Sequence, residues 1–434
     1  MKVLVIGGGG REHAIVWALR KSARVTEVVC APGNAGIAQS ARTVPVNAGD
    51  LAAMLRVVEA EHPALTVVGP ELPLSLGLVD ELERRGLRVF GPTQAATRLE
   101  SSKSFAKEFM QRHAIPTAAY AVCRSLEEVR RELPRFSESV VVKADGLAAG
   151  KGVVICQSYA EAEKAAAEIF SGALLGTAEK ELVLEEFLDG EELSFFALCD
   201  GKHAVALAAA QDHKRIGEGD TGPNTGGMGA YTADGLMSAE LEKWLLANVA
   251  QPVVDKMASE GSPFHGILFC GMMMTPQPDG SIRPMVLEFN TRFSDPETEA
   301  ILVRLESDIV DLFDAAIDGT ADRLAIKMKP GASVCVIAAS GGYPGKVVNG
   351  QPISGLDVQH ADAVVFHAGT AAKDGAIVTA GGRVLAVTTV SSPSTSAMPL
   401  QNALGKAYAA LEKISFNGMQ FRRDIAWRAL RKGL

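Results

Sequence analysis

The chain begins with a short continuous apolar run, residues 3–6, which is typical of a strand buried on both faces of a parallel sheet. A glycine turn at residues 7–10 follows it, and residues 11–21 are predicted to form a helix. Further buried strands are predicted at residues 28–30, 65–68 and 87–90. The N-terminal part, residues 1–101, is therefore predicted to be a Rossmann-like domain of an α/β protein.

The middle of the chain predicts a small lobe inserted into a larger domain. A strand at residues 140–142 precedes a loop of small residues, 147–152, which leads into a hairpin strand and a helix. We expect this lobe, about residues 117–184, to act as a mobile lid on a central domain of residues 102–325. Adjacent strands are expected further along at 266–274 and 284–290, with the run Met272-Met273-Met274 in the core.

After residue 325 the pattern changes to alternating runs, which predict strands at residues 333–338, 364–367 and 383–390. A helix is expected from about Leu400. These segments predict a small C-terminal α+β domain, residues 326–434. We expect it to pack against the N-terminal sheet and to wall the site without chemistry of its own.

The composition is that of a globular protein of about three domains, with 434 residues of which 47% are hydrophobic. A formal net charge of −8 argues against nucleic acid as a partner. The six cysteines form no CxxC pair and lie in apolar sequence, which indicates reduced buried thiols. No apolar run approaches the roughly 20 residues of a membrane helix, and the N-terminal run is too short for a signal peptide, so a cytoplasmic protein is expected.

The predicted parallel strands are followed by loops that favour a ligand-binding crevice. The residues concerned are Gly8, Gly9, Gly10, Asn34, Pro70, Glu71 and Gly91. In an open parallel sheet, ligands bind beyond the carboxyl ends of the strands. A dinucleotide is disfavoured, because the third position of the GxGxxG pattern is Glu12 and the strand at 28–30 is not followed by an acidic residue for a ribose. A phosphate on a smaller ligand fits better.

Several lysines point to phosphate chemistry in the central domain. Lys103 and Lys107 are four residues apart and share one face of a predicted helix, while Lys143 follows a strand. The loop that contains Lys151 and Gly152 can close on phosphates with backbone N–H groups and a cation. It lacks the GxxxxGK[ST] pattern of a Walker A loop.

The segment 183–188 is apolar and acidic, and it is predicted to be the hinge where the lid rejoins the body. Such a hinge can present backbone groups to an adenine edge, with Phe187 and Leu188 against the ring. Glu192 can accept hydrogen bonds from ribose hydroxyls. A solvated acidic loop is the alternative interpretation of this segment.

A mixed polar strand is predicted to carry a metal ion. Glu288, Asn290 and Arg292 are spaced two apart, so they are expected to point the same way. A carboxylate and an amide oxygen suit Mg²⁺, and the arginine can hold a transferring phosphoryl group. Asp212 and Lys214 alternate in the same manner beside a glycine-rich loop and could face one ligand.

Motifs spread over the whole chain resemble those of the ATP-grasp ligases, and among them the phosphoribosylamine–glycine ligase (glycinamide ribonucleotide synthetase) family. The motifs are GGREHA (9–14), APGNAG (31–36), VGPE (68–71), FGPT (90–93), KADGLAAGKGV (143–153), EEFLDGEE (185–192), QDHKR (211–215), DTGPNTGGMGAY (220–231), EFNTRFSDPETE (288–299), AASGGYPG (338–345), VFHAGT (365–370) and GGRVL (381–385). Their number and order make the resemblance specific.

The resemblance implies a central ATP-grasp fold and the reaction of ATP, glycine and 5-phosphoribosylamine to glycinamide ribonucleotide, ADP and phosphate. Glycine would first be activated as glycyl phosphate, in de novo purine biosynthesis. Mg²⁺ or Mn²⁺ would be the cofactor. The pathway leaves room for transient contact with neighbouring purine-pathway enzymes.

The resemblance also implies roles for single residues. The phosphates of ATP are expected at Lys107 and Lys143, with Lys103 beside them, adenine at Glu185, Phe187 and Leu188, and ribose at Glu192. Lys151, Gly152 and Lys214 are also expected to bind ATP. Phosphoribosylamine is expected at Gly8, Gly9, Gly10, Asn34, Pro70, Glu71, Asp212 and Lys214, and the metal at Glu288 and Asn290. Arg292, Lys143 and Asp295 are expected to be catalytic, with Arg292 at the phosphoryl group and Asp295 at the amine.

Two positions depart from the family pattern. Gly8 stands where the family has Asn, which removes a contact to the sugar phosphate, and Ser294 stands where it has Gly. If the backbone at 294 had positive φ, the serine would strain that turn.

Two alternatives are weighed against this interpretation. Another ATP-grasp ligase, such as a carboxylase-like enzyme, would need bicarbonate and a biotin partner, and the N-terminal motifs argue against it. A non-catalytic nucleotide sensor is disfavoured because the metal strand and the phosphate lysines are retained.

Overall fold

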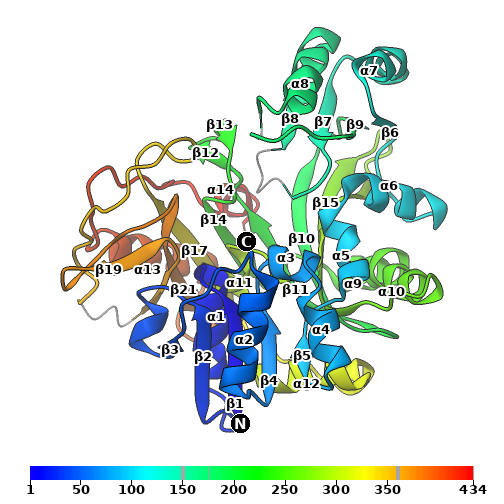
Figure 1. Cartoon of the computed structure of the whole chain (residues 1–434). Helices are drawn as coiled ribbons and strands as arrows, with labels where there is room; N and C mark the ends of the chain where they lie inside the picture. Colours follow the sequence, from blue (N-terminus) through cyan, green and yellow to red (C-terminus); the bar gives the residue numbers. More distant parts are fainter. Residues whose placement is uncertain (148–151, 175, 358–361, 434) are drawn as a thin grey trace.

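The computed structural model describes residues 1–147, 152–174, 176–357 and 362–433. The N-terminal part contains a parallel sheet with strand order β3-β2-β1-β4-β5 (Figure 1). Its strands are β1 (Lys2–Gly7), β2 (Glu27–Pro32), β3 (Arg42–Thr43), β4 (Leu65–Val68) and β5 (Val89–Phe90). Its helices are α1 (Gly10–Leu19), α2 (Leu51–Glu61), α3 (Glu71–Ser75), α4 (Leu78–Arg84) and α5 (Gln94–Ser101). The predicted Rossmann-like sheet is confirmed, with β5 shorter than expected.

A separate lobe projects from the body at the upper right of Figure 1. Its antiparallel sheet has the order β6-β9-β7-β8, with β6 (Tyr120–Cys123), β7 (Val140–Ala144), β8 (Val153–Cys156) and β9 (Leu182–Glu186). Helices α7 (Leu126–Glu132) and α8 (Tyr159–Ser171) complete it. The lobe has its own small core, in which Val142, Ile169 and Leu184 are fully buried. This α+β lobe matches the predicted lid.

The remaining strands build one continuous sheet with the order β16-β15-β10-β11-β14-β17-β21-β18. Its central-domain strands are β10 (Glu191–Asp200), β11 (Ala204–Asp212), β14 (Gly229–Ala233), β15 (His265–Pro276) and β16 (Ile282–Asn290). The C-terminal strands are β17 (Ala332–Ala339), β18 (Ala363–His367) and β21 (Arg383–Ser391). The C-terminal strands therefore extend the central sheet through the β14–β17 pairing. Alternation in the sequence predicts a strand but does not name its partner.

Helices and short hairpins cover the large sheet and its edges (Figure 1). They are α6 (Lys103–Arg112), α9 (Ala239–Leu245), α10 (Gln251–Ser259), α11 (Glu297–Leu302), α12 (Ile309–Asp318), α13 (Pro399–Leu411) and α14 (Trp427–Arg431), with strands β12 (Arg215–Gly217), β13 (Thr221–Asn224), β19 (Thr370–Lys373) and β20 (Ala376–Thr379). The β12–β13 hairpin includes the first part of the glycine-rich segment, residues 220–229.

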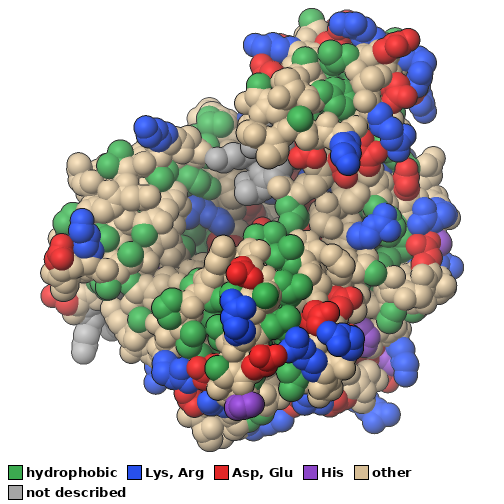
Figure 2. Space-filling model, in the orientation of Figure 1, with side chains coloured by type: hydrophobic (Ala, Val, Ile, Leu, Met, Phe, Trp, Pro, Cys, Tyr) green, Lys and Arg blue, Asp and Glu red, His purple; other side chains and the backbone are tan. Residues whose placement is uncertain are grey.

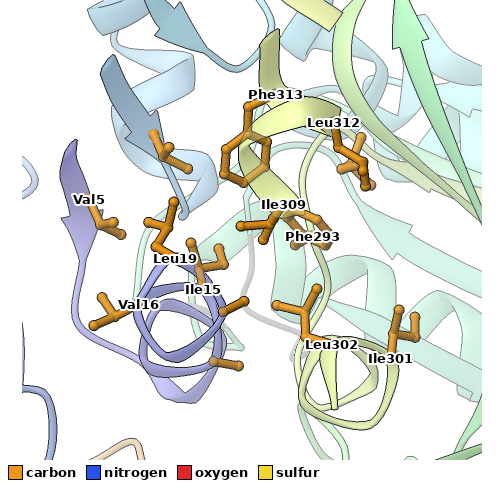
Figure 3. Packing of buried hydrophobic residues seen from close by; sticks show 14 of the residues in the cluster. Val5, Ile15, Val16, Leu19, Phe293, Ile301, Leu302, Ile309, Leu312 and Phe313 are labelled. Carbon is orange, nitrogen blue, oxygen red and sulfur yellow. The ribbon is translucent and has the colours of Figure 1, made fainter. Parts of the chain in front are cut away.

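Helix α1 locks the N-terminal sheet onto the body. Ile15, Val16 and Leu19 are fully buried and belong to the same apolar cluster as residues of α11 and α12 (Figure 3). Phe90 of β5 meets Phe313 of α12 with ring centroids 4.2 Å apart. This packing fixes the carboxyl ends of the parallel strands beside the large sheet.

Two expectations from composition can be compared with the structure. None of the described helices is long and apolar enough to span a membrane. The six cysteines are free and buried, as predicted. Burial raises the pKa of the Cys123 and Cys156 thiols to about 11, so both stay protonated at neutral pH.

Replacing Phe313 by alanine is expected to lower the free energy of unfolding by about 3–5 kcal/mol, because a fully buried ring is removed from the contact between α12 and β5. Urea unfolding followed by circular dichroism measures this change. The control Ile282→Ala removes a side chain that is 51% exposed and should change the free energy by no more than about 0.5 kcal/mol. Equal effects of the two substitutions would contradict the packing role of Phe313.

Candidate active site

A cavity of about 650 Å³ lies where the lid, the N-terminal sheet and the large sheet meet. Figure 2 shows the surface hollowed between the projecting lobe and the C-terminal part of the body. The predicted residues that line this cavity are Gly8, Gly9, Pro70, Glu71, Lys103, Lys107, Lys143, Gly152, Glu185, Phe187, Leu188, Glu192, Asp212, Lys214, Glu288, Asn290, Arg292 and Asp295. The fold thus brings segments from most of the chain to one place.

A buried ion triad joins the lid to the body at this cavity. The carboxylate of Glu185 on β9 lies 2.5 Å from Nζ of Lys107 on α6 and 2.5 Å from Nζ of Lys143 on β7. Lys107 also donates to Thr117 Oγ1 at 2.6 Å, and Thr117 Oγ1 donates to the Val286 carbonyl at 2.7 Å. Burial lowers the pKa of Lys107 to about 8, although Glu185 opposes the change.

The Glu185 carboxylate is engaged by these two cations, and its expected contact with adenine stays a prediction. The apolar side chains on this side of the cavity include Val141, Ile155, Leu147, Phe187, Leu188, Met273 and Leu287. Met273 was expected in the core; Met272 is fully buried there, whereas Met273 points to the cavity because alternate strand residues face opposite sides.

The small-residue loop is anchored at both of its described ends. Lys103 Nζ donates to the Gly146 carbonyl at 2.9 Å, and Ala144 N donates to the Gly152 carbonyl at 2.7 Å. Lys103 is therefore tied to the loop, and burial lowers its pKa. Lys151, the cation expected to close on phosphates, lies outside the described residues.

Glu288 and Asn290 lie at the end of β16 and both line the cavity. Within the described part of the chain, neither side chain has a hydrogen-bond partner; the nearest ion pair of Glu288 is Lys214 Nζ at 3.9 Å. Burial raises the pKa of Glu288, but Lys214 and Lys143, among other cations, outweigh it and hold the pKa below its ordinary value. An ionised carboxylate beside an amide oxygen fits a hard divalent cation.

Arg292 reaches the cavity although it lies beyond the end of β16, so strand alternation does not orient it as expected. Its Nη2 lies 2.8 Å from Glu100 Oε1 and its Nε lies 3.3 Å from Glu71 Oε2. Burial raises the pKa of Glu71, but Arg292 and Arg11 overcome this and lower it to about 2. Arg292 thus couples the N-terminal domain to the segment that follows β16.

Carboxylates accept hydrogen bonds from backbone N–H groups of the glycine turn after β1 and of the start of α1. Gly9 N donates to Glu12 Oε2 at 2.6 Å, and Arg11 N donates to Asp295 Oδ2 at 3.3 Å. These N–H groups are the ones expected to bind an anion. Gly10 does not line the cavity, and a Cβ there would lie 2.4 Å from Glu299 Oε1. The absence of a side chain at Gly10 permits this close packing, and its expected contact with phosphoribosylamine stays a prediction.

Asn34 has a structural role that the sequence did not predict. Its side-chain amide donates to the Gly8 carbonyl at 2.9 Å and to the His367 carbonyl at 2.6 Å. Its Oδ1 accepts from the backbone N–H groups of Gly36 and Ile37. Asn34 therefore ties the glycine turn to the C-terminal segment. It also lines a second cavity of about 420 Å³ with Gly8 and Gly9.

The C-terminal segment supplies a charged residue to the wall of the site, where it was expected to form a wall. Arg383 lines both cavities, and its Nη2 lies 3.1 Å from Asp295 Oδ1. It also donates to the carbonyls of Asp295, at 2.8 Å, and of Gly226. The motif GGRVL contains this arginine, but nothing in the local pattern brings it to the carboxyl ends of the parallel strands.

Asp212, Lys214 and Glu192 lie together on the wall between lid and body. Lys214 Nζ lies 2.7 Å from Glu192 Oε2. Burial lowers the pKa of Lys214, but Glu192, Glu288 and Asp212 outweigh it and raise the pKa above its ordinary value. Glu297 is a further cavity carboxylate that the sequence analysis did not single out.

The two departures from the family pattern are accommodated. Ser294 does not have positive φ, so the turn is not strained by its side chain. A Cβ at Gly8 would lie 2.4 Å from the Gly33 carbonyl oxygen, so glycine permits this close approach.

A nucleotide-sized cavity between a small antiparallel lid and a large antiparallel sheet, with lysines on both sides, defines the ATP-grasp class. Family models bear this out: residues 101–298 match the phosphoribosylglycinamide synthetase ATP-grasp (A) domain, residues 1–100 its N domain and residues 333–428 its C domain. The chain belongs to the phosphoribosylglycinamide synthetase family.

Relatives agree with this assignment. The chain is 48% identical to a phosphoribosylamine–glycine ligase of Xanthomonas axonopodis pv. citri, covering 99% of this chain and 98% of the relative. A phosphoribosylamine–glycine ligase crystal structure from Thermotoga maritima has 35% identity and a TM-score of 0.83, covering 98% of this chain and 100% of that one. A Campylobacter jejuni biotin carboxylase, with 13% identity, a TM-score of 0.71 and coverage of 99% and 95%, shares the fold.

The affinity for ADP is expected to fall at alkaline pH, because Lys107 must be protonated to bind a phosphate and its pKa in the free protein is about 8. Below pH 8 the cation is present; above it the affinity should fall by up to about tenfold for each pH unit. Calorimetric titration of ADP from pH 7 to 10 measures this dependence. The variant Lys107→Met should bind ADP more weakly at pH 7, and its affinity should not fall further above pH 8. If the affinity of the wild-type protein stayed constant up to pH 10, a contact between Lys107 and a phosphate would be contradicted.

Proposed function

We propose that this protein joins glycine to 5-phosphoribosylamine with ATP, giving glycinamide ribonucleotide, ADP and phosphate in purine biosynthesis. The observation that carries the proposal is the single cavity of a phosphoribosylglycinamide synthetase family member, in which the lid lysines, the metal strand and the N-terminal glycine turn meet. A carboxylase would also need a biotin partner, and the relatives at 35–48% identity are phosphoribosylamine–glycine ligases.

The reaction requires activation of glycine, because a carboxylate does not accept an amine directly. An oxygen of the glycine carboxylate attacks the γ-phosphorus, ADP leaves and glycyl phosphate forms. The amine of phosphoribosylamine then attacks the glycyl carbonyl, loses a proton, and phosphate leaves. No side-chain nucleophile is needed, so the protein contributes alignment, charge neutralisation and exclusion of water. Alignment alone is worth roughly 7–11 kcal/mol.

ATP fits between the lid and the large sheet. Lys107 and Lys143, held on either side of Glu185, would contact its phosphates, with Lys103 at the loop. The apolar wall that includes Phe187 would hold adenine, and residues 186–188 would meet its polar edge through their backbone. Glu192 would accept hydrogen bonds from the ribose after exchanging its contact with Lys214.

A divalent cation would be held by the carboxylate of Glu288 and the amide oxygen of Asn290, with phosphate oxygens and water as further ligands. When bound, Mg²⁺ or Mn²⁺ neutralises charge on the phosphates. The cations around Glu288 keep its carboxylate ionised and ready to coordinate. Arg292, positioned by Glu71 and Glu100, would face the transferring phosphoryl group.

Phosphoribosylamine would lie against the N-terminal sheet, with its phosphate near Gly8, Gly9 and Asn34 and its amine near Asp295. The geometry that supports this placement is the second cavity, which opens beside these residues and is lined by Arg383. Pro70 and Glu71 border the main cavity on the same side. We propose domains of residues 1–101, 102–325 and 326–434. The first would bind phosphoribosylamine, the second would bind ATP and the metal, and the third would contribute to the wall of the site.

The function is tested by measuring ADP formation with each substrate omitted in turn. Glycine and phosphoribosylamine should both be required for sustained turnover, and the product should be glycinamide ribonucleotide by mass spectrometry. ADP release that does not depend on glycine would exclude a glycine ligase.

Replacing Glu288 by alanine is expected to lower Mg²⁺-dependent turnover by about 100-fold or more, because one of the two proposed protein ligands is lost. The protein should stay folded by circular dichroism, since the Glu288 side chain has no hydrogen bond among the described residues. The exposed control Asp279→Asn, on the turn between β15 and β16, should keep wild-type turnover. Unchanged turnover of Glu288→Ala would remove Glu288 from the metal site.

A further inference from the structure

The C-terminal segment 422–432, RRDIAWRALRK, is basic, yet it begins with a fully buried arginine. Nε and Nη2 of Arg422 donate to the two carboxylate oxygens of Asp424 at 2.8 and 2.7 Å. Its Nη1 donates to the Arg215 carbonyl at 3.1 Å and to Asp220 Oδ1 at 2.8 Å. A buried guanidinium is stable only where its donors are paired. Arg422 therefore joins its own segment to the β12–β13 hairpin.

Two further contacts join this segment to the hairpin at its tip and at its base. At the tip, Arg428 of α14 also donates to Asp220. At the base, Nε2 of the buried His213 accepts the Ala426 N–H at 2.9 Å. Figure 1 shows α14 next to the hairpin, although the two are far apart in the sequence. We call residues 422–428 the C-terminal clasp.

The β12–β13 hairpin is too small to be stable by itself. β12 has three residues and β13 has four, and an isolated two-stranded hairpin is at best marginally stable in water. Residues 221–223 are exposed, so hydrophobic burial adds little stability there. The Gly219 N–H in its turn donates to Asp424 Oδ2 at 2.8 Å. The position of the hairpin therefore depends on the clasp.

The hairpin in turn positions one wall of the main cavity. Residues 224–226, at its C-terminal end, line this cavity, as does Lys214, which precedes β12. The backbone N–H and Oγ1 of Thr225 both donate to the Lys214 carbonyl, at 2.7 and 2.8 Å. No residue of the clasp is among the described residues that line the cavity. The clasp therefore acts on the cavity through the hairpin.

Resting on the proposed function, we propose that the C-terminal clasp is a positioning element for the nucleotide. By holding the β12–β13 hairpin, it keeps Lys214 and residues 224–226 ordered before ATP binds. An ordered wall binds the nucleotide more tightly, because less conformational freedom is lost on binding. Coupling between two sites is reciprocal, so the bound nucleotide also stabilises the clasp.

This reciprocity is measurable on the wild-type protein by amide hydrogen exchange with and without Mg²⁺ and ADP. Exchange in peptides that cover residues 422–428 should slow by about threefold or more at saturating ADP. Peptides from the β19–β20 hairpin, which is of similar size and belongs to the same C-terminal part, serve as the control and should keep their rates. Exchange in the clasp that does not respond to ADP would overturn the proposal.

The variants Asp220→Asn and Arg428→Met each remove one ion pair between clasp and hairpin. Asparagine keeps the shape of Asp220 and tolerates its left-handed backbone, with φ +57°. Each variant should raise the Kd of ADP by about five- to tenfold, with a nearly unchanged melting temperature. Tryptic cleavage after Lys214 or Arg215 should speed up by a similar factor, because the open form of the hairpin is more populated.

The matched control Arg431→Met removes a cation of the same helix that lies over the Trp427 ring, and it should change neither the cleavage rate nor the Kd of ADP. Faster cleavage in Asp220→Asn and Arg428→Met with an unchanged ADP affinity would overturn the proposal, because the clasp would then hold the hairpin without acting on the site. Unchanged cleavage and affinity in both variants would also overturn it.

If neither variant folds, the hydrogen-exchange comparison on the wild-type protein decides the question. Failure of the proposed function is separate, because ADP binding and hydrogen exchange need no glycine. A wild-type protein that forms ADP without glycine would exclude the ligase and leave the effect of the clasp on nucleotide binding measurable.

Discussion

The site depends on the buried contact of Glu185 with Lys107 and Lys143, one from the body and one from the lid. Removing three charges from water is costly in free energy. A buried lysine without a carboxylate partner would either lose its proton or move into solvent. The shared carboxylate lets two lysines sit close together, and the pKa of Lys107 still falls to about 8. A polyphosphate would supply the negative charge that this arrangement lacks. The same triad fixes where lid strands β7 and β9 meet helix α6, so the residues proposed to bind phosphate also set the position of the lid.

Two further arginine contacts organise the cavity in the same manner. Arg292 binds Glu71 and Glu100, and so links the end of β16 to the N-terminal domain. Arg383 binds Asp295 and comes from β21, the C-terminal part of the large sheet. In each case a cation from one segment is paired with a carboxylate from another. These ion pairs hold the charged side chains of the cavity in place before any substrate binds. The free-energy cost of ordering these side chains on binding is therefore lower.

The hydrophobic core explains how segments far apart in the sequence are held in fixed positions around the cavity. Helix α1 is buried against α11 and α12, and strands of the C-terminal part continue the central sheet. Interiors are close-packed, so a displacement of one segment would be felt by the others. The apolar cluster joins residues from β1 to β21 and so fixes the elements that carry the glycine turn and Arg383 relative to one another. Alignment of three substrates needs this rigidity more than it needs any single reactive side chain.

The sequence alone determined the fold class and the family, and most of the site residues that it predicted line the cavity, because strands, glycine turns and lysine spacing are local signals. The individual roles of Glu288, Asn290 and Asp295 stay predictions. Only the tertiary structure decided that Glu185 pairs with two lysines, that Asn34 ties loops together and that Arg383 enters the site. These facts depend on which strand pairs with which and on contacts between residues far apart in the chain. Local pattern carries no information on such partners, since the same alternation is compatible with several pairings.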